Sequence, residues 1–328
     1  MVNVTRVDPP EWPLALSVLY HQLPATERSL QVREALDAER CGQLSLDGLH
    51  AAWDEARRPL GAMLAISQPD ATAFVWPPVV SAKVDPRPVT EGLLRTVGDW
   101  LDSSGVRFAQ CLLEVSQSSE AEVLERNGFP CFARLRFLLR SFRQPLPLIF
   151  RKSWQRHPFC AKNEQRFVDV LERTYEQTLD CPALNGARSA QECLHGHRQG
   201  ATFDPDLWTL FELDGRDVGL ILLTAHARGR EWELQYMGVA PDARGQGLGR
   251  AMLNEALHAA RDAGADSLRL AVDDKNLFAN ALYEELGFTE SARRQVHIRV
   301  GKTHSVAQST RSEHAPETGN KSSPRVKP

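Results

Sequence analysis

The chain has 328 residues, of which 42% are hydrophobic and 25% are charged, and its formal net charge at pH 7 is −3. This length predicts about two domains of ~150 residues each, and this composition is typical of soluble globular proteins. The small net charge, the absence of an apolar run of ~18 residues and a first segment without a secretion signal predict a cytoplasmic protein that binds neither nucleic acid nor membranes.

The six cysteines are scattered along the chain and form no C-x-x-C pair, so we expect reduced thiols rather than a disulfide framework. One group of possible zinc ligands is Cys181, Cys193, His195 and His197. Its spacing matches no zinc pattern, and the two histidines would diverge on a helix. We therefore predict no metal site, and these residues are interpreted as ordinary core and surface positions.

Two prolines, Pro145 and Pro147, mark residues 143–148 as a linker between a first domain, residues 1–142, and a second domain, residues 149–300. Residues 301–328 are rich in Ser, Thr, Lys, Pro and His and contain almost no large apolar side chains. This segment cannot build a core, so we predict a disordered tail.

The second domain begins with two predicted helices and continues with three predicted strands. Residues 167–178 have apolar side chains at helical spacing, and Ser189 to Glu192 form a capping box that opens a second helix. Strands are expected at 208–213, 218–224 and 232–239, the first two joined by a hairpin turn at Asp214-Gly215. These strands predict an antiparallel meander.

The pattern then changes to alternating helices and strands. We expect a helix from Leu248 that ends at Gly264, a strand at 267–272, a helix at 277–286 that ends at Gly287, and a last strand at 296–300. A strand, a crossover helix and another strand predict one parallel pair inside an otherwise antiparallel sheet.

The segment Arg244–Arg250 contains three glycines and two arginines at the start of the first of these helices. Backbone N–H groups without side chains, the positive end of a helix and two cations favour an anion such as a diphosphate. A Rossmann loop would need a third glycine where Met252 stands, and a P-loop would need a Gly-Lys-Ser/Thr end, which is absent. A glycine-rich turn without a ligand is the remaining alternative.

The spacing Arg244-x-x-Gly247-x-Gly249 resembles the pyrophosphate loop of the GNAT superfamily of N-acetyltransferases. Residues 276–288 resemble the second signature of that family, N-x-x-A-x-x-L-Y-x-x-x-G-F, and the order of the predicted elements is also that of the family. The resemblance covers about half of the chain. It implies the α/β class in its α+β GNAT form, a mixed and mostly antiparallel sheet flanked by helices.

The resemblance implies an acetyl-CoA-dependent N-acetyltransferase, in which a primary amine of a small molecule or peptide attacks the thioester directly. Two neighbouring strands should diverge, and the pantetheine arm should lie in the gap between them. The positions implied to bind the coenzyme are Met237, Gly238, Val239, Arg244, Gly245, Gln246, Gly247, Leu248, Gly249, Arg250, Asn276 and Asn280.

Two residues are candidates for proton transfer. An alkylamine must lose its proton before it attacks a thioester, and several family members place a glutamate at the position of Glu233 as the general base. Strict alternation would put Glu233 on the same strand face as Gln235 and Met237, although an exposed strand carboxylate is the alternative. By the same resemblance Tyr283 would protonate the departing thiolate, and a packed aromatic without a chemical role is the alternative.

The first domain resembles the second at a fixed offset. Residues 124–129 are similar to residues 283–288 at an offset of 159 (287 − 128), and the same offset places Gly264 on Gly105. Two glycines at one offset predict a repeat. The chain is therefore expected to contain two tandem GNAT-like domains.

The repeat is degenerate at nearly every position that would bind or react. The offset replaces the phosphate loop by a segment with Asp85, Pro86 and Pro88, and it places Phe74 on Glu233 and Leu124 on Tyr283. Prolines donate no N–H, and an aspartate repels phosphate. We expect a first domain that has lost acetyl-CoA binding and forms one wall of the acceptor site. Tandem pairs of this kind occur in the family, mycothiol synthase among them, but the sequence does not identify the acceptor.

The acceptor is expected between the first two helices and the meander, where Asp180 and Glu176 are candidates to attract an amine. A non-catalytic acetyl-CoA-binding sensor or a partner-binding module is the alternative to an enzyme. The phosphate loop does not separate these possibilities, whereas Glu233 and Tyr283 favour the enzyme.

Overall fold

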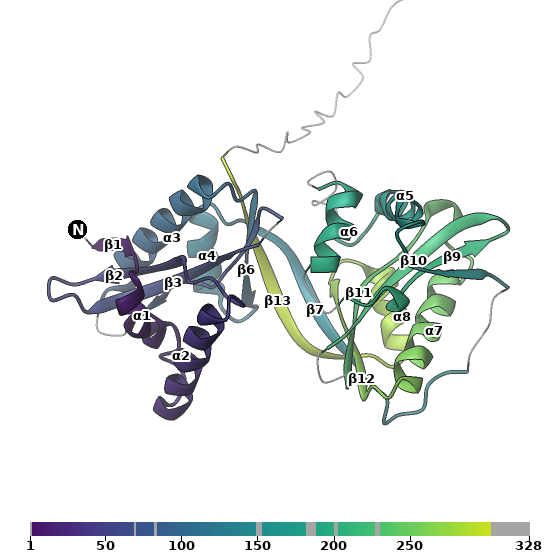
Figure 1. Ribbon diagram of the computed structural model, residues 1–328, viewed down its shortest axis with the longest axis horizontal. Coiled ribbons are helices and arrows are strands. Elements are labelled where there is room, and N and C mark those ends of the chain that lie inside the picture. Colours follow the sequence, from purple (N-terminus) through teal and green to yellow (C-terminus); the bar gives the residue numbers. More distant parts are fainter. Residues whose placement is uncertain are drawn as a thin grey trace, which may run out of the picture.

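The computed structural model describes residues 2–68, 70–81, 84–148, 153–181, 188–199, 203–226 and 230–302. The predicted tail lies outside these residues from position 303 onward, as do residues 182–187 of the predicted acceptor loop. Within the described part, one mixed sheet of 13 strands runs through both halves of the chain (Figure 1).

The N-terminal domain contains a mixed set of strands and helices. In chain order its elements are β1 (Asn3–Arg6), η1 (Pro9–Glu11), α1 (Trp12–Leu19), α2 (Ala25–Arg40), β2 (Gly48–Trp53), β3 (Pro59–Ser67), β4 (Thr72–Val75), β5 (Val79–Val80), α3 (Pro86–Ser103), β6 (Phe108–Glu114), α4 (Ser118–Arg126) and β7 (Cys131–Ser141).

The C-terminal domain repeats this order. Its elements are β8 (Gln155–Pro158), α5 (Glu164–Tyr175), α6 (Ala190–Gln199), η3 (Pro205–Leu207), β9 (Trp208–Leu213), β10 (Arg216–Ala225), β11 (Glu231–Val239), η4 (Pro241–Ala243), α7 (Leu248–Asp262), β12 (Ser267–Asp273), α8 (Leu277–Glu285) and β13 (Thr289–Val300). Both helices before the meander, the three meander strands and the two crossover helices lie where the sequence predicts them, and the last strand is longer than expected.

The predicted repeat is confirmed at the level of single elements. Both β12 and α8 follow β6 and α4 at the same offset of 159 residues (267 − 108 and 277 − 118). Each domain contains one parallel pair, β4 with β6 and β11 with β12, and all other pairs are antiparallel. Gly128 and Gly287, which end the equivalent helices, have φ angles of +85° and +82°. The chain thus consists of two tandem domains with the same order of elements.

The last strands of the two domains are exchanged. Strand β7 leaves the N-terminal domain and pairs with β12, whereas β13 leaves the C-terminal domain and pairs with β6 (Figure 1). The two exchanged strands also pair with each other from Thr289↔Leu139 to His297↔Cys131. The domain boundaries at residues 142 and 149 remain a prediction. Strands from both sides of these boundaries belong to one sheet.

Each half of the sheet has an apolar core on both faces. In the C-terminal half, Trp232 and Leu234 of β11 point toward α7 and α8, and this core also contains Leu138 of the exchanged strand β7. On the opposite face, Trp208 and Leu222 pack with α5 and α6. Alternating strand side chains therefore require helices on both faces.

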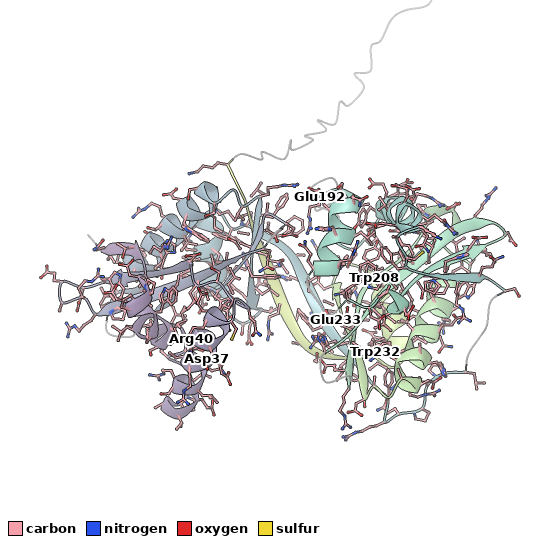
Figure 2. All side chains as sticks on the ribbon, in the orientation of Figure 1. Asp37, Arg40, Glu192, Trp208, Trp232 and Glu233 are labelled. Carbon is pink, nitrogen blue, oxygen red and sulfur yellow. The ribbon has the colours of Figure 1, made fainter. Side chains whose placement is uncertain are left out.

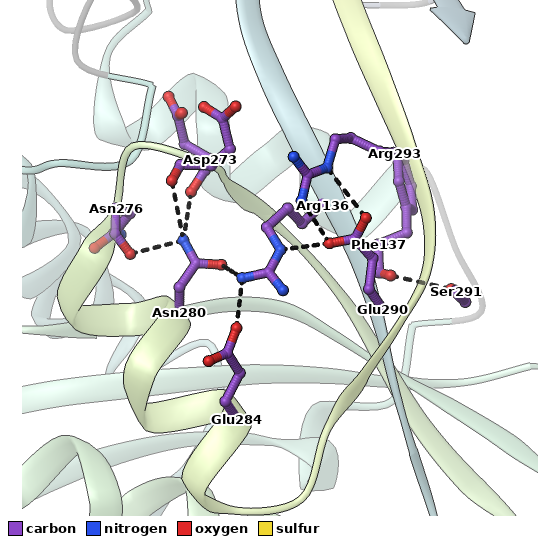
Figure 3. A network of polar contacts seen from close by, with 10 residues as sticks. Arg136, Phe137, Asp273, Asn276, Asn280, Glu284, Glu290, Ser291 and Arg293 are labelled. Atoms are coloured by element: carbon purple, nitrogen blue, oxygen red, sulfur yellow. Dashed lines mark hydrogen bonds and ion pairs between the residues drawn. The ribbon is translucent and has the colours of Figure 1, made fainter. Parts of the chain in front are cut away.

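Polar contacts fasten the exchanged strand β7 to α8. Arg136 donates to the side-chain oxygen of Asn280 at 2.8 Å and forms ion pairs with Glu284 at 2.8 Å and Glu290 at 2.7 Å (Figure 3). Four residues further along β7, the buried guanidinium of Arg140 donates to the carbonyl oxygens of Leu286, Ser141 and Pro145. These contacts join the two domains at the end of the second signature.

Within the described ranges, none of the helices combines the length and the apolar surface that a bilayer crossing requires.

We expect that residues 1–142, produced alone, do not fold to a stable monomer. Both edges of β7 would lose their partners, because β12 and β13 belong to the other half of the chain. Circular dichroism and size-exclusion chromatography would check this, with the full chain as the control. A monomeric fragment with a cooperative thermal transition would contradict the role assigned to the strand exchange.

Candidate active site

The candidate site begins where β11 and β12 diverge. The two strands pair only from Glu231↔Ser267 to Leu234↔Leu270, after which β11 stays with β10 and β12 stays with β7. A β-bulge in β11 lies at the same point, since Leu222 pairs with Tyr236 and Leu223 with Leu234, leaving Gln235 without a partner in the ladder. The predicted divergence is confirmed.

A cavity of about 660 Å³ occupies the gap. It is lined by the diverging strands, by the end of α5 and the residues after it, and by the start of α8. Its described walls include Thr174, Tyr175, Asp180, Arg188, Cys193, Gln235, Tyr236, Met237, Gly238, Val239, Arg244, Asn276, Phe278, Ala279 and Tyr283. The free backbone edge of residues 237–239 therefore faces the cavity, as the family resemblance implies.

The glycine loop lies at the end of β11 and opens α7. Gly245 and Gly247 have φ angles of +77° and +73°, a region that other residues adopt at a cost, and no atom lies within 4 Å of a side chain added at either position. The first N–H groups of α7 have no helical acceptor, and Gly247 at the N-cap supplies no side-chain oxygen. This open, electropositive helix end fits a pyrophosphate.

The two arginines of the loop are engaged with the protein. Arg244 donates to the carbonyl oxygens of Val239 and Thr174, both at 3.0 Å, so it ties the loop to β11 and α5. Arg250 forms an ion pair with Glu285 of α8. Their positive charges stay beside the loop, although neither guanidinium is free of partners.

The equivalent helix end in the N-terminal domain is already filled. Asp85 is the N-cap of α3, and its carboxylate accepts a hydrogen bond from the backbone N–H of Arg87 at 3.1 Å. Pro86 and Pro88 contribute no N–H to this turn. An anion would meet a carboxylate here, in agreement with the degenerate loop expected from the sequence.

Tyr283 lies in the wall of the cavity. Its side chain is buried, its ring packs edge-on against Phe288, and no hydrogen bond joins its hydroxyl to another residue of the described ranges. Burial, with smaller contributions from Asp180 and Tyr236, raises the pKa of Tyr283, so the hydroxyl keeps its proton at neutral pH.

The predicted asparagines have different surroundings. Asn276 lines the cavity and is the N-cap of α8, where its side chain accepts from the N–H of Ala279 at 3.2 Å. Asn280 is buried and does not line the cavity, because its amide bonds to Arg136 and to the carbonyl of Asp273 (Figure 3). Asn280 thus connects α8 to strand β7.

The bulge at Gln235 changes which side chains of β11 share a face. Tyr236 packs with the core under α5 and α6, whereas Met237 packs with Leu234 against the α7 core. The alternation expected from the sequence, with Glu233 and Met237 on one face, is therefore wrong, since one extra residue reverses the order of faces.

Glu233, which is labelled in Figure 2, does not line the cavity, although the next two residues, Leu234 and Gln235, do. Its carboxylate contacts the ring of His226 at 3.0 Å and the guanidinium of Arg269 at 3.1 Å. Arg269 also pairs with Glu231 at 2.6 Å, so one cation neutralises two carboxylates of β11. The general-base role of Glu233 stays a prediction.

Several cavity residues were not singled out from the sequence. Tyr236 bonds through its hydroxyl to Thr174 Oγ1 at 2.7 Å, and burial raises the pKa of Tyr236 to about 12. Tyr175 and Arg188 also face the cavity. The bulge reverses the face on which Tyr236 lies, and no local sequence pattern predicts that Arg188 lies beside the cavity.

Of the predicted acceptor residues, Asp180 lines the cavity and accepts from the backbone N–H of Asp273 at 2.9 Å. Burial raises the pKa of the Asp180 carboxyl, and the Asp273 N–H opposes this shift. Glu176 is exposed outside the cavity wall. Among the described residues there is no cluster of His, Cys, Asp and Glu that could hold a metal, and the ring of His195 contacts Gln199 instead.

Comparisons with known proteins show what this chain is similar to. Residues 171–288 match the acetyltransferase (GNAT) family. A mycothiol acetyltransferase from Streptomyces griseus is 27% identical over 303 residues, which cover 81% of this chain and 94% of that protein.

Solved structures show the same fold. A GCN5-related N-acetyltransferase from Sphaerobacter thermophilus has a TM-score of 0.63 at 18% identity, and the match covers 91% of this chain and 95% of the other. A tandem GNAT protein from the clavulanic acid biosynthesis pathway has a TM-score of 0.51 at 11% identity, over 92% and 98% of the two chains.

His197 makes the stability of this region depend on pH. Burial first, and the charge of Arg188 second, lower the pKa of His197 to about 4 from its ordinary value of 6.5. Between pH 6.5 and 4 the unfolded chain therefore binds a proton that the folded chain does not, and stability falls as the pH falls.

Between pH 7 and pH 5, the free energy of unfolding should fall by a larger amount in the unchanged protein than in His197→Gln. We expect the two decreases to differ by ~1–2 kcal/mol, a range that allows for the partial exposure of the ring. Urea unfolding at both pH values measures this difference. His195→Gln, which changes an exposed histidine of the same helix, should behave as the unchanged protein. Equal losses in all three proteins would show that His197 titrates normally.

Proposed function

We propose that the chain is a tandem member of the GNAT superfamily of acetyltransferases and that it transfers the acetyl group of acetyl-CoA to a primary amine. The observation that carries the proposal is a cavity lined by the free edge of β11, by the protonated hydroxyl of Tyr283 and by Arg244, which begins the loop that leads to the open N-terminus of α7.

The coenzyme, when bound, supplies an activated acetyl thioester. The N–H groups of Gly245, Gly247 and Gly249 and the start of α7 would hold its pyrophosphate, and the backbone of residues 237–239 would align its pantetheine arm. Tyr283 holds a proton at its hydroxyl for the departing sulfur. With the coenzyme bound, the cavity walls would cover part of the thioester and so limit its hydrolysis.

Glu233 is proposed as the group that accepts the proton of the amine, acting from the rim of the cavity through water. Its position one residue before the lining residues Leu234 and Gln235 supports this role. The carboxylate is fixed by Arg269 and His226, which orient it.

The acceptor is proposed to be a small-molecule amine of the kind on which mycothiol acetyltransferases act. The 27% identity that extends over 94% of the Streptomyces griseus protein supports this class. Its extent matters because Arg188 of the cavity wall forms an ion pair with Asp70 of the N-terminal domain, so both domains contribute to this region.

The proposal is tested by thiol release from acetyl-CoA with a library of amines that includes the desacetyl form of mycothiol, together with calorimetric titration of acetyl-CoA. We expect amine-dependent release and a stoichiometry near one coenzyme per chain. Binding without release for any amine would favour a non-catalytic sensor, and a stoichiometry near two would contradict the loss of the N-terminal site.

Tyr283→Phe keeps the ring and removes the proton donor. Turnover should fall by about 10- to 100-fold, at the lower end of general-acid effects, because a thiolate is already a moderately good leaving group. Coenzyme affinity should change little, since the hydroxyl has no partner in the described protein. Normal turnover would transfer the acid role to solvent or to the acceptor.

Glu233→Gln should lower turnover most at low pH, where the amine is mostly protonated, by up to about 10²-fold or more. Glu231→Gln is the matched control, because both carboxylates lie on β11 and pair with Arg269. Turnover against pH is measured for both variants. The same loss at every pH, or the same loss in both variants, would assign Glu233 to charge balance instead of base catalysis.

A further inference from the structure

Arg188 links the cavity to the N-terminal domain. Its guanidinium lies in the cavity wall next to Tyr175 and Cys193, and it forms an ion pair with Asp70 of the N-terminal domain at 2.8 Å. Asp70 lies between β3 and β4. A carboxylate of the degenerate domain therefore contacts a cation that lines the candidate active site, without lining the site itself.

Three contacts fix this ion pair. The other oxygen of Asp70 accepts from the N–H and the hydroxyl of Thr72, at 3.2 and 2.6 Å. The same nitrogen of Arg188 that meets Asp70 also donates to the carbonyl of Glu192 at 3.1 Å. Both partners are largely buried, with side-chain exposures of 26% for Arg188 and 16% for Asp70.

Helix α6 passes close to the ion pair between Arg188 and Asp70, and it has a glycine at this point. A Cβ atom at Gly196 of α6 would lie 2.8 Å from Arg188 Nη2 and 3.4 Å from Asp70 Oδ2. Glycine in the middle of a helix costs roughly 0.5–1 kcal/mol relative to alanine, so a steric reason for it is informative. A second pair, Arg107 with Glu192 at 2.5 Å, holds α6 against the N-terminal domain; Glu192 is labelled in Figure 2.

The donors that remain on Arg188 determine what it can bind. Its Nη2 atom is used by Asp70 and Glu192, whereas Nε and Nη1 donate to none of the described residues. Asp70 also neutralises the charge of the guanidinium. A neutral oxygen, as in a hydroxyl group, can accept these hydrogen bonds at a lower desolvation cost than an anion, whereas an anion meets an already neutralised cation and the carboxyl of Asp180 in the same cavity.

Resting on the proposed acetyl transfer, we propose that Arg188, positioned by Asp70, selects acceptor amines that carry neutral hydroxyl groups over amines that carry an anionic group. The degenerate domain thereby determines acceptor specificity through one carboxylate. Arg188 is the residue that touches the acceptor, and Asp70 is a positioning residue that also sets the charge which the acceptor meets.

Two amines that differ by one phosphate test the proposal: glucosamine and glucosamine 6-phosphate. We expect the unchanged protein to have the higher kcat/KM with glucosamine. Asp70→Asn leaves the charge of Arg188 without compensation, and the ratio of the two kcat/KM values should move toward the phosphorylated amine by about tenfold or more. A purely structural defect would lower both values equally.

Two further variants complete the test. Asp37→Asn removes the carboxylate partner of Arg40 on the exposed helix α2 of the same domain, and it should leave the ratio unchanged (Figure 2). Gly196→Ala should displace the guanidinium and lower kcat/KM for glucosamine, without favouring the phosphate. Acetyl-CoA affinity should be unchanged in all of them, which verifies that the coenzyme site is folded.

The outcomes separate this proposal from the proposed function. If no amine in the library causes thiol release, the acetyl transfer itself fails. If amines are acetylated but the ratio is the same in Asp70→Asn and in the unchanged protein, or if neither glucosamine compound is a substrate, the role of Arg188 and Asp70 is overturned.

Discussion

The separation of β11 from β12 after Leu234 is the constraint on which the site depends. Buried backbone groups need partners, and a sheet normally supplies them on both edges of a strand. Here each strand keeps one partner, β10 for β11 and β7 for β12, and the facing edges become free together. The free edge of residues 237–239 can then pair with an extended ligand that carries amide groups, as a pantetheine arm does.

The other features of the site keep this gap open. Gly238 lets α5 approach β11, since a Cβ atom there would lie 2.7 Å from Thr174. Arg244 bonds to the carbonyl oxygens at the end of β11 and of α5, so the loop, the strand and the helix move together. Arg244 therefore fixes the position of the loop as well as supplying a positive charge. Its replacement would change the geometry of the loop in addition to its electrostatics.

The sequence predicted the local structure well and the pairing across the domains poorly. The glycine loop, the capping box at Ser189 and the helix ends at Gly264 and Gly287 depend on residues within one turn, and all were found where expected. The exchange of β7 and β13 depends on which domain each of these last strands pairs with. The two strands have equivalent positions in the repeat, so the local sequence does not distinguish the exchanged pairing from the unexchanged one. Alternation failed at Gln235 because a bulge inserts one residue without changing composition.

The exchange explains which parts of the N-terminal domain can change without loss of the C-terminal site. The far edge of β12 is satisfied only through β7 in the described sheet, and Leu138 of β7 completes the core around α7. Prolines and an aspartate at the start of α3 remove an anion site of that domain, yet they touch neither β7 nor the contacts of Asp70 and Arg107 with the α6 region. A domain can therefore lose its own coenzyme loop while it continues to supply a central strand and a charged wall to its neighbour.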